Sequence, residues 1–286
     1  MITKDIIIIG TGFAGMGAAM KLRESGREDF IILEKAEDVG GTWRDNTYPG
    51  CECDIPSHMY SFSYELNADW SKSFSSQPEI WAYMRKVADE QGIRKYITFG
   101  VEVTGASWDD DRKVWTIRTT NGEDYEARFI IAGVGGLHIP NIPEIEGADT
   151  FAGPRFHSAQ WDHSVDLTGK KVVVIGTGAS AIQFLPIIAE EVGQLTVFQR
   201  TPPWVLPKKD KPTAAWRKKV FSSIPGAQRA YRNALYWALE ARALGFNGHI
   251  KVLPLAQKIA KRNIDKTISD PELRAKRRSQ LPHRER

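Results

Sequence analysis

The sequence predicts an α/β protein that repeats one unit of strand, turn and helix. Two stretches, beginning at Asp5 and Lys171, each combine a run of β-branched residues, a Gly-Thr-Gly turn and a helical pattern. The apolar runs are dense enough for strands buried on both faces, as in parallel sheets covered by helices. The 286 residues, 42% of them hydrophobic, suffice for one large domain or two modest domains with cores of their own.

The glycine positions in both stretches match a turn that holds a dinucleotide. In such a turn the first two glycines allow a tight bend and the close approach of a pyrophosphate, which the helix N-terminus stabilises. The third position must be small so that helix and strand can pack. These positions are Gly10, Gly12 and Gly15 in the first stretch and Gly176, Gly178 and Ala181 in the second. The sequence therefore predicts two Rossmann-like dinucleotide-binding domains.

The end of the second strand in each unit indicates which nucleotide each turn binds. Glu34 lies 24 residues after Gly10, and Arg200 lies 24 residues after Gly176, so the sequence predicts identical registers with opposite charges. A carboxylate accepts hydrogen bonds from ribose hydroxyls and repels a 2′-phosphate, whereas a guanidinium pairs with that phosphate. We therefore expect FAD at the first turn and NADPH at the second. The alternative is that both residues are solvated ends of strands.

Further elements are predicted between and after the two turns. Residues 101–120 alternate in polarity around two hairpin turns, which predicts a small antiparallel sheet. A strand over 125–132 closes the first domain, an extended linker follows, and apolar residues at helical spacing predict helices within 213–266. The expected domains are an incomplete FAD-binding domain at 1–140, a linker and incomplete NADPH-binding domain at 141–207, and a helical insertion with a divergent basic tail at 208–286.

Three motifs resemble one family of flavoproteins. Phe151–Asp162 has the pattern Phe-x-Gly-x-x-x-His-x-x-x-Trp-Asp, which resembles the fingerprint of the type I Baeyer–Villiger monooxygenases, a branch of the class B flavin monooxygenases. The segments 40–50 and 54–63 are similar to the flavin-facing part of that family, and Thr196–Trp204 resembles its NADPH-phosphate strand. The resemblance extends from Met1 to about Lys276.

The resemblance implies roles for individual residues. The residues implied to hold FAD are Gly10, Gly12, Gly15 and Glu34, with Gly41, Thr42 and Trp43 closing over the cofactor. Those implied to bind NADPH are Gly176, Gly178, Ser180, Arg200 and Thr201. Asp54 is the implied catalytic residue near the flavin; the alternative is a cap of the Asp-Ile-Pro-Ser turn. The fingerprint residues are Phe151, Gly153, His157, Trp161 and Asp162, of which His157 and Trp161 could instead simply pack a linker.

The resemblance also implies a reaction. Members of the family use NADPH, FAD and O2 to insert one oxygen atom into a ketone through a C4a-peroxyflavin, which gives an ester or lactone. One alternative is an N- or S-oxygenating flavin monooxygenase, which differs in the protonation of the peroxide. A second alternative, from a different class, is an inactive truncated fragment that only binds nucleotides.

The end of the sequence departs from the family. Residues 269–276 still match it, whereas 277–286 do not, and the arginine that stabilises the peroxide anion in the family is missing. We therefore expect the carboxyl-terminal part to be missing, as in a frameshifted or prematurely ended gene product. Both domains are then expected to expose apolar surface.

Composition excludes several other classes. The net charge is +4, and six Lys or Arg residues lie in the last fourteen positions. Nucleic-acid binding needs a basic face spread over the folded part, whereas this chain has mainly a basic tail, so we expect no nucleic-acid partner. The longest apolar runs are too short to span a bilayer and no secretory signal is recognisable, so we expect a cytoplasmic protein. Cys51 and Cys53 are expected to be reduced thiols, with no metal site. The substrate and the oligomeric state are not readable from the sequence.

Overall fold

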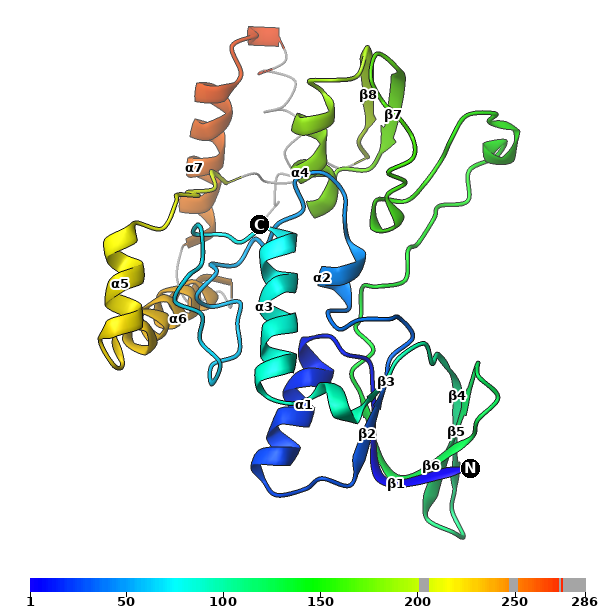
Figure 1. Ribbon diagram of the computed structural model, residues 1–286. Coiled ribbons are helices and arrows are strands. Elements are labelled where there is room, and N and C mark those ends of the chain that lie inside the picture. The colour runs from blue at the N-terminus through cyan, green and yellow to red at the C-terminus, as the bar shows by residue number, and fades with distance from the viewer. Residues whose placement is uncertain (201–205, 247–251, 273, 275–286) are drawn as a thin grey trace. The chain divides into compact units, whose positions relative to one another are not determined.

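A computed structural model shows how the chain folds (Figure 1). The structure describes residues 1–200, 206–246, 252–272 and 274. The chain divides into two compact units. The first unit contains Met1–Tyr48 and Ser76–Val165, and the second contains Pro49–Ser75 and Asp166–Arg286. Both units are therefore built from segments that are separate in the sequence.

The first unit contains a six-stranded sheet with the strand order β3-β2-β1-β6-β5-β4. The strands are β1 (Ile2–Ile9), β2 (Phe30–Leu33), β3 (Ile97–Thr98), β4 (Val103–Asp109), β5 (Val114–Thr119) and β6 (Tyr125–Ala132). Strands β3, β2, β1 and β6 are parallel, and β4 and β5 form the predicted hairpin. The hairpin does not form a sheet of its own, because β5 pairs antiparallel with β6 and extends the parallel sheet.

The first unit also contains three α-helices and three short 3-10 helices. They are α1 (Phe13–Glu24), α2 (Thr42–Asp45), α3 (Gln77–Glu90), η1 (Arg94–Tyr96), η2 (Ala148–Thr150) and η3 (Ser158–Gln160). Residues of α1, α2 and α3 contribute buried side chains to the core. The α1 and α3 helices lie side by side, with the rings of Phe13 and Tyr83 stacked at 6.4 Å (Figure 1). The largest fully buried apolar side chains of this core include Ile7, Ile8, Met16, Ile32, Ile80 and Met84. Burial of these side chains is the main stabilising contribution to the unit.

The second unit repeats the strand, turn and helix on a smaller scale. Strands β7 (Lys171–Ile175) and β8 (Gln194–Phe198) are parallel, and α4 (Ala179–Ile188) connects them. The predicted helical region is confirmed as α5 (Ala215–Ser223), α6 (Ala227–Phe246) and α7 (Val252–Thr267). Ile175 and Phe198, at the ends of β7 and β8, are 61% and 57% exposed. This two-stranded sheet therefore exposes apolar side chains, as expected from the sequence.

The segment Pro49–Ser75 belongs to the second unit, although the sequence placed it in the FAD-binding domain. It pairs with residues 206–213, because the amide of Ser73 donates to the carbonyl of Lys211 at 2.9 Å and that of Thr213 to the carbonyl of Ser71 at 2.8 Å. The ring of His58 is buried and makes edge contacts with Phe221 and Tyr231. The two compact units thus differ from the expected domain ranges 1–140, 141–207 and 208–286, and these ranges remain a prediction.

Two further expectations concern membranes and thiols. Within the described part of the chain, no helix is both long enough and apolar enough to cross a bilayer. Cys51 and Cys53 are buried and form no disulfide, which agrees with the prediction of reduced thiols. Burial raises the pKa of the Cys53 thiol to about 11, so this thiol is protonated at neutral pH and a poor nucleophile.

Candidate functional site: two nucleotide turns and an acidic segment

The first turn combines close packing behind it with open space in front. Gly10 has a φ of +93°, and its amide donates to the carbonyl of Leu33 at 2.8 Å. A Cβ on Gly15 would lie 1.8 Å from the carbonyl oxygen of Gly10, so only glycine lets α1 approach the strand this closely. By contrast, a Cβ on Gly12 would meet no atom within 4 Å, and Gly12 caps α1 without a side chain. A phosphate can therefore reach the N-terminus of α1.

Glu34 follows β2 and points its carboxylate at this turn. The side chain is 4% exposed. Its Oε2 accepts from the amide and hydroxyl of Thr11, at 2.8 and 2.5 Å, and its Oε1 accepts from the amide of Ala36 at 3.0 Å and from Arg44 Nη1 at 3.1 Å. Burial alone would raise the pKa of Glu34, but these hydrogen bonds and the charge of Arg44 outweigh it and lower the pKa. The group is therefore an ionised hydrogen-bond acceptor.

The segment 40–43 closes over the first turn. The amide of Gly40 donates to the carbonyl of Thr11 at 3.1 Å, and a Cβ on Gly41 would lie 3.2 Å from the Cα of Gly12. Thr42 begins α2, and Trp43 is buried. The structure thus brings together all the residues of the first unit that the sequence predicted for FAD. Their binding of the cofactor stays a prediction.

The second turn has the same form. Gly176 has a φ of +106°, and its amide donates to the carbonyl of Phe198 at 2.9 Å. Gly178 caps α4 without a side chain, Ser180 lies in the first turn of that helix, and Ala181 is buried at the position that must be small. A Cβ on either glycine would meet no atom within 4 Å. The N-terminus of α4 is therefore also open to a phosphate.

The position equivalent to Glu34 in the second unit is Gln199 and not Arg200. Leu33 pairs with Ile9, the last residue of β1, and Phe198 pairs with Ile175, the last residue of β7. The residue after each pair is Glu34 in the first unit and Gln199 in the second. The prediction of identical registers was wrong by one residue, because the connection between the two strands is one residue shorter in the second unit.

Arg200 lies one residue beyond that position. It is exposed, and no ion pair joins it to any other residue that the structure describes. Its guanidinium can therefore meet an anion from solution. Thr201, the other residue predicted for the NADPH phosphate, lies outside the described residues. Sequence reasoning missed Gln199 because it counted from the glycine; counting from the apolar end of the strand would have found it.

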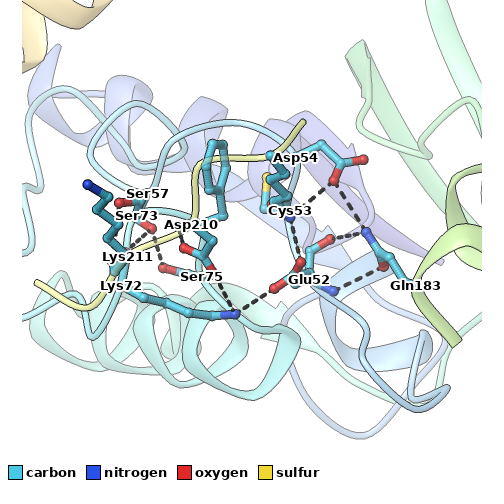
Figure 2. A network of polar contacts seen from close by, with 12 residues as sticks. Glu52, Cys53, Asp54, Ser57, Lys72, Ser73, Ser75, Gln183, Asp210 and Lys211 are labelled. Atoms are coloured by element: carbon cyan, nitrogen blue, oxygen red, sulfur yellow. Dashed lines mark hydrogen bonds and ion pairs between the residues drawn. The ribbon is translucent and has the colours of Figure 1, made fainter. Parts of the chain in front are cut away.

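Asp54 lies in the second unit within a network of polar contacts (Figure 2). Its Oδ1 is 3.3 Å from Lys208 Nζ and 3.4 Å from Gln183 Nε2. Its hydrogen bonds within the described chain go to these two residues and not to the backbone of the Asp-Ile-Pro-Ser turn, which argues against the simple turn cap. The side chain is 62% exposed, so the second carboxylate oxygen is accessible to a ligand.

Glu52 is the centre of the same network. Its carboxylate lies 2.5 Å from Lys72 Nζ on one oxygen and 2.5 Å from Lys208 Nζ on the other. Gln183, on α4, donates to the carbonyl of Glu52 at 2.9 Å and accepts from its amide at 3.2 Å (Figure 2). Lys72 also pairs with Asp210 at 3.0 Å. The helix that begins at the second turn is thus bonded directly to the segment that carries Asp54.

The predicted fingerprint residues lie in the first unit and make local contacts. His157 Nδ1 accepts from the amide of Ala159 at 3.1 Å and caps η3, and the ring of Trp161 lies edge-on to that of Phe156 at 5.2 Å. Asp162 accepts from the hydroxyl and amide of Ser164, which lowers the pKa of Asp162. Phe151 is exposed, and its ring covers Gly153, where a Cβ would lie 2.6 Å from the ring. The fingerprint role of these residues and the packing alternative for His157 and Trp161 both stay predictions.

Comparison with known proteins identifies the family. A family model described as pyridine nucleotide-disulphide oxidoreductase matches residues 7–224. The chain belongs to this family. It is 46% identical over 271 residues to a Baeyer-Villiger monooxygenase of Pseudomonas aeruginosa. The matched region covers 95% of this chain and 51% of the relative. The chain spans about half the length of the curated relatives it matches.

Solved structures agree with this family and fold. The closed crystal structure of cyclohexanone monooxygenase matches with a TM-score of 0.81 and 30% identity, over 99% of this chain and 60% of that chain. OTEMO in complex with FAD and NADP matches with a TM-score of 0.72 and 35% identity, over 83% of this chain and 44% of that chain. The predicted α/β fold and the resemblance to Baeyer–Villiger monooxygenases are confirmed, and the matched family is one of oxidoreductases. FAD and NADP, found in the second structure, are the cofactors predicted from the sequence.

Proposed function

We propose that this chain forms the nucleotide-binding part of a monooxygenase that uses FAD and NADPH to insert one oxygen atom from O2 into a ketone. The product is an ester or lactone. One observation carries the proposal: two open glycine turns occur in one chain, the first beside a buried carboxylate and the second beside an exposed guanidinium. The similarity to proteins named Baeyer-Villiger monooxygenase and cyclohexanone monooxygenase supports a ketone as the substrate.

The first turn fits FAD. The N-terminus of α1 stabilises the pyrophosphate through its backbone amides and its dipole, and the space in front of Gly12 admits it. Glu34 is ionised and accepts from ribose hydroxyls, for which the Thr11 hydroxyl must give up its hydrogen bond. Gly41 and Trp43 cover the turn and exclude water. When bound, FAD supplies the group that activates O2.

The second turn fits NADPH, the hydride donor. The N-terminus of α4 stabilises its pyrophosphate, and the Arg200 guanidinium pairs with its 2′-phosphate. Asp54 is the proposed catalytic residue of this unit. Lys208 and Gln183 hold one of its oxygens, and the other is exposed and accepts a hydrogen bond from a bound ligand. The substrate binds as a neutral ketone, which requires no charged partner.

Flavin content, coenzyme preference and product analysis test the proposal in turn. Purified chain is reconstituted with FAD, and flavin reduction by NADPH or NADH is followed anaerobically by the loss of absorbance. Cyclohexanone and labelled O2 are then added and the products analysed. From this chain we expect retained flavin and faster reduction by NADPH. We expect one labelled oxygen in the lactone from a chain extended by a family-like carboxyl-terminal half, and little or no lactone without it. Absence of flavin would refute the first assignment and equal rates with NADH the second. Oxygenation of an added amine or sulfide in place of the ketone would favour the N- or S-oxygenating alternative.

A further inference from the structure

The two turns share a contact between their middle residue and the end of the second strand. The hydroxyl of Thr11 donates to Glu34 Oε2 at 2.5 Å, and the hydroxyl of Thr177 accepts from Gln199 Nε2 at 3.0 Å. The backbone is the same in both units, because Gly10 and Gly176 each donate to the carbonyl of the residue before this position. Glu34 and Gln199 are therefore structural equivalents, with a different charge.

This difference in charge reverses the hydrogen bond to the threonine. A carboxylate only accepts, so the Thr11 hydroxyl uses its proton to bond Glu34. The Gln199 amide donates, so the Thr177 hydroxyl accepts and keeps its proton for another acceptor. The second turn thus offers one more donor and one less negative charge than the first. Both changes favour a ligand with an additional phosphate, because phosphate oxygens accept hydrogen bonds and carry negative charge.

We propose that Gln199 determines the nucleotide specificity of the second turn together with Arg200. This inference rests on the proposed binding of NADPH there. Arg200 supplies the attraction for a 2′-phosphate, and Gln199 keeps the neighbouring position free of the carboxylate that the first turn carries. A glutamate at position 199 would repel the phosphate and pair with Arg200, which would cancel the charge that selects it.

The test compares NADP⁺ with NAD⁺ by isothermal titration calorimetry on the full chain, so that no catalytic activity is needed. The variants are Gln199→Glu, which copies the first turn, and Gln199→Met, which removes the amide without adding charge. Gln194→Glu is the matched control, because Gln194 is an exposed glutamine at the opposite end of β8. Arg200→Ala tests the assignment of the turn itself. Circular dichroism confirms that each variant is folded, and Gln199→Asp replaces Gln199→Glu if the latter does not fold.

We expect Gln199→Glu to lower the ratio of NADP⁺ to NAD⁺ affinity by about tenfold or more, because one charge-assisted contact is lost. Gln199→Met and Gln194→Glu should leave the ratio within about threefold of the parent value. An unchanged ratio in Gln199→Glu, or an equal loss in Gln194→Glu, would overturn the role of Gln199. If Gln199 is overturned in this way but Arg200→Ala still lowers the ratio, the proposal that this turn binds NADPH stands. A parent chain without preference for NADP⁺ would overturn both the role of Gln199 and the proposed binding of NADPH.

Discussion

Replacing Arg44 by glutamine should destabilise the first unit by about 3 kcal/mol. The guanidinium donates to Glu34 Oε1 at 3.1 Å, to the carbonyl of Asp38 at 2.5 Å and to the carboxylate of Asp45 at 2.7 Å. The side chains of Arg44 and Glu34 are only 12% and 4% exposed. Removing one partner of a buried ion pair costs about 3–5 kcal/mol. Since three other donors still reach Glu34, we expect the lower end of that range.

The loss should depend on pH in a definite direction. Burial alone raises the pKa of Glu34, but its hydrogen bonds and Arg44 lower it below the ordinary value of 4.5. A group with a lowered pKa in the folded state stabilises the protein above its unfolded pKa, and this contribution disappears as the pH falls through the folded pKa. The pKa of Glu34 is higher in Arg44→Gln. The stability difference between parent and variant should therefore be full at neutral pH and shrink below pH 4.5.

Urea unfolding at several pH values measures the free energy of unfolding. Hydrogen exchange of the Thr11 amide, which donates to Glu34 at 2.8 Å, shows whether the effect is local to the turn. Arg85→Gln is the control, because Arg85 is exposed and, among the residues that the structure describes, stacks on Trp81, a contact worth about 0.5–1 kcal/mol. Equal losses in the two variants, or a loss in Arg44→Gln that does not change with pH, would refute this reasoning.

Three further predictions concern the turns and a buried histidine. Gly12→Ala should fold but bind less flavin, because a Cβ at Gly12 meets open space where the cofactor binds. Gly15→Ala should lower the stability of the protein, because a Cβ there meets backbone. The flavin content and the unfolding midpoint of each variant test this difference. Arg200→Ala should lower the preference for NADP⁺ over NAD⁺ by about tenfold or more, as measured by titration calorimetry. Burial lowers the pKa of His58 to about 4, so stability should decline as the pH falls from 6.5 to about 4, by on the order of 3 kcal/mol in total. His58→Gln should remove this part of the pH dependence in urea unfolding, and an unchanged slope would contradict the assignment.

Local patterns explain most of what the sequence predicted correctly. The two glycine turns, their flanking strands and the hairpin over 101–120 all follow from signals within a few residues, and each forms where expected. The helices after residue 213 follow from apolar spacing in the same way. These elements are fixed by backbone geometry and local burial, so no knowledge of distant contacts is needed.

Contacts between distant residues explain what the sequence could not predict. The segment 49–75 joins the second unit through the pairs of Glu52 with Lys208 and of Lys72 with Asp210, and nothing in the spacing of these charges reveals their partners. The sequence assigned Arg200 to the position of Glu34, whereas the structure places Gln199 there. The pairing of the two strands sets this position, and the number of residues in the helix and turns between them does not reveal the pairing. A register error of one residue leaves the predicted motif intact but changes which side chain faces the ligand.

The split composition of the second unit also has a consequence during synthesis. Gln183, which holds Glu52, follows it by 131 residues. At about 5–20 residues per second, the ribosome needs roughly 7 to 26 seconds to make that stretch. For most of this time Cys51, Cys53 and the neighbouring segment are outside the ribosome but lack Gln183 and Lys208, which contact this segment in the completed fold. Oxidants and cysteine-directed reagents should therefore modify these thiols on nascent chains far faster than in the completed fold.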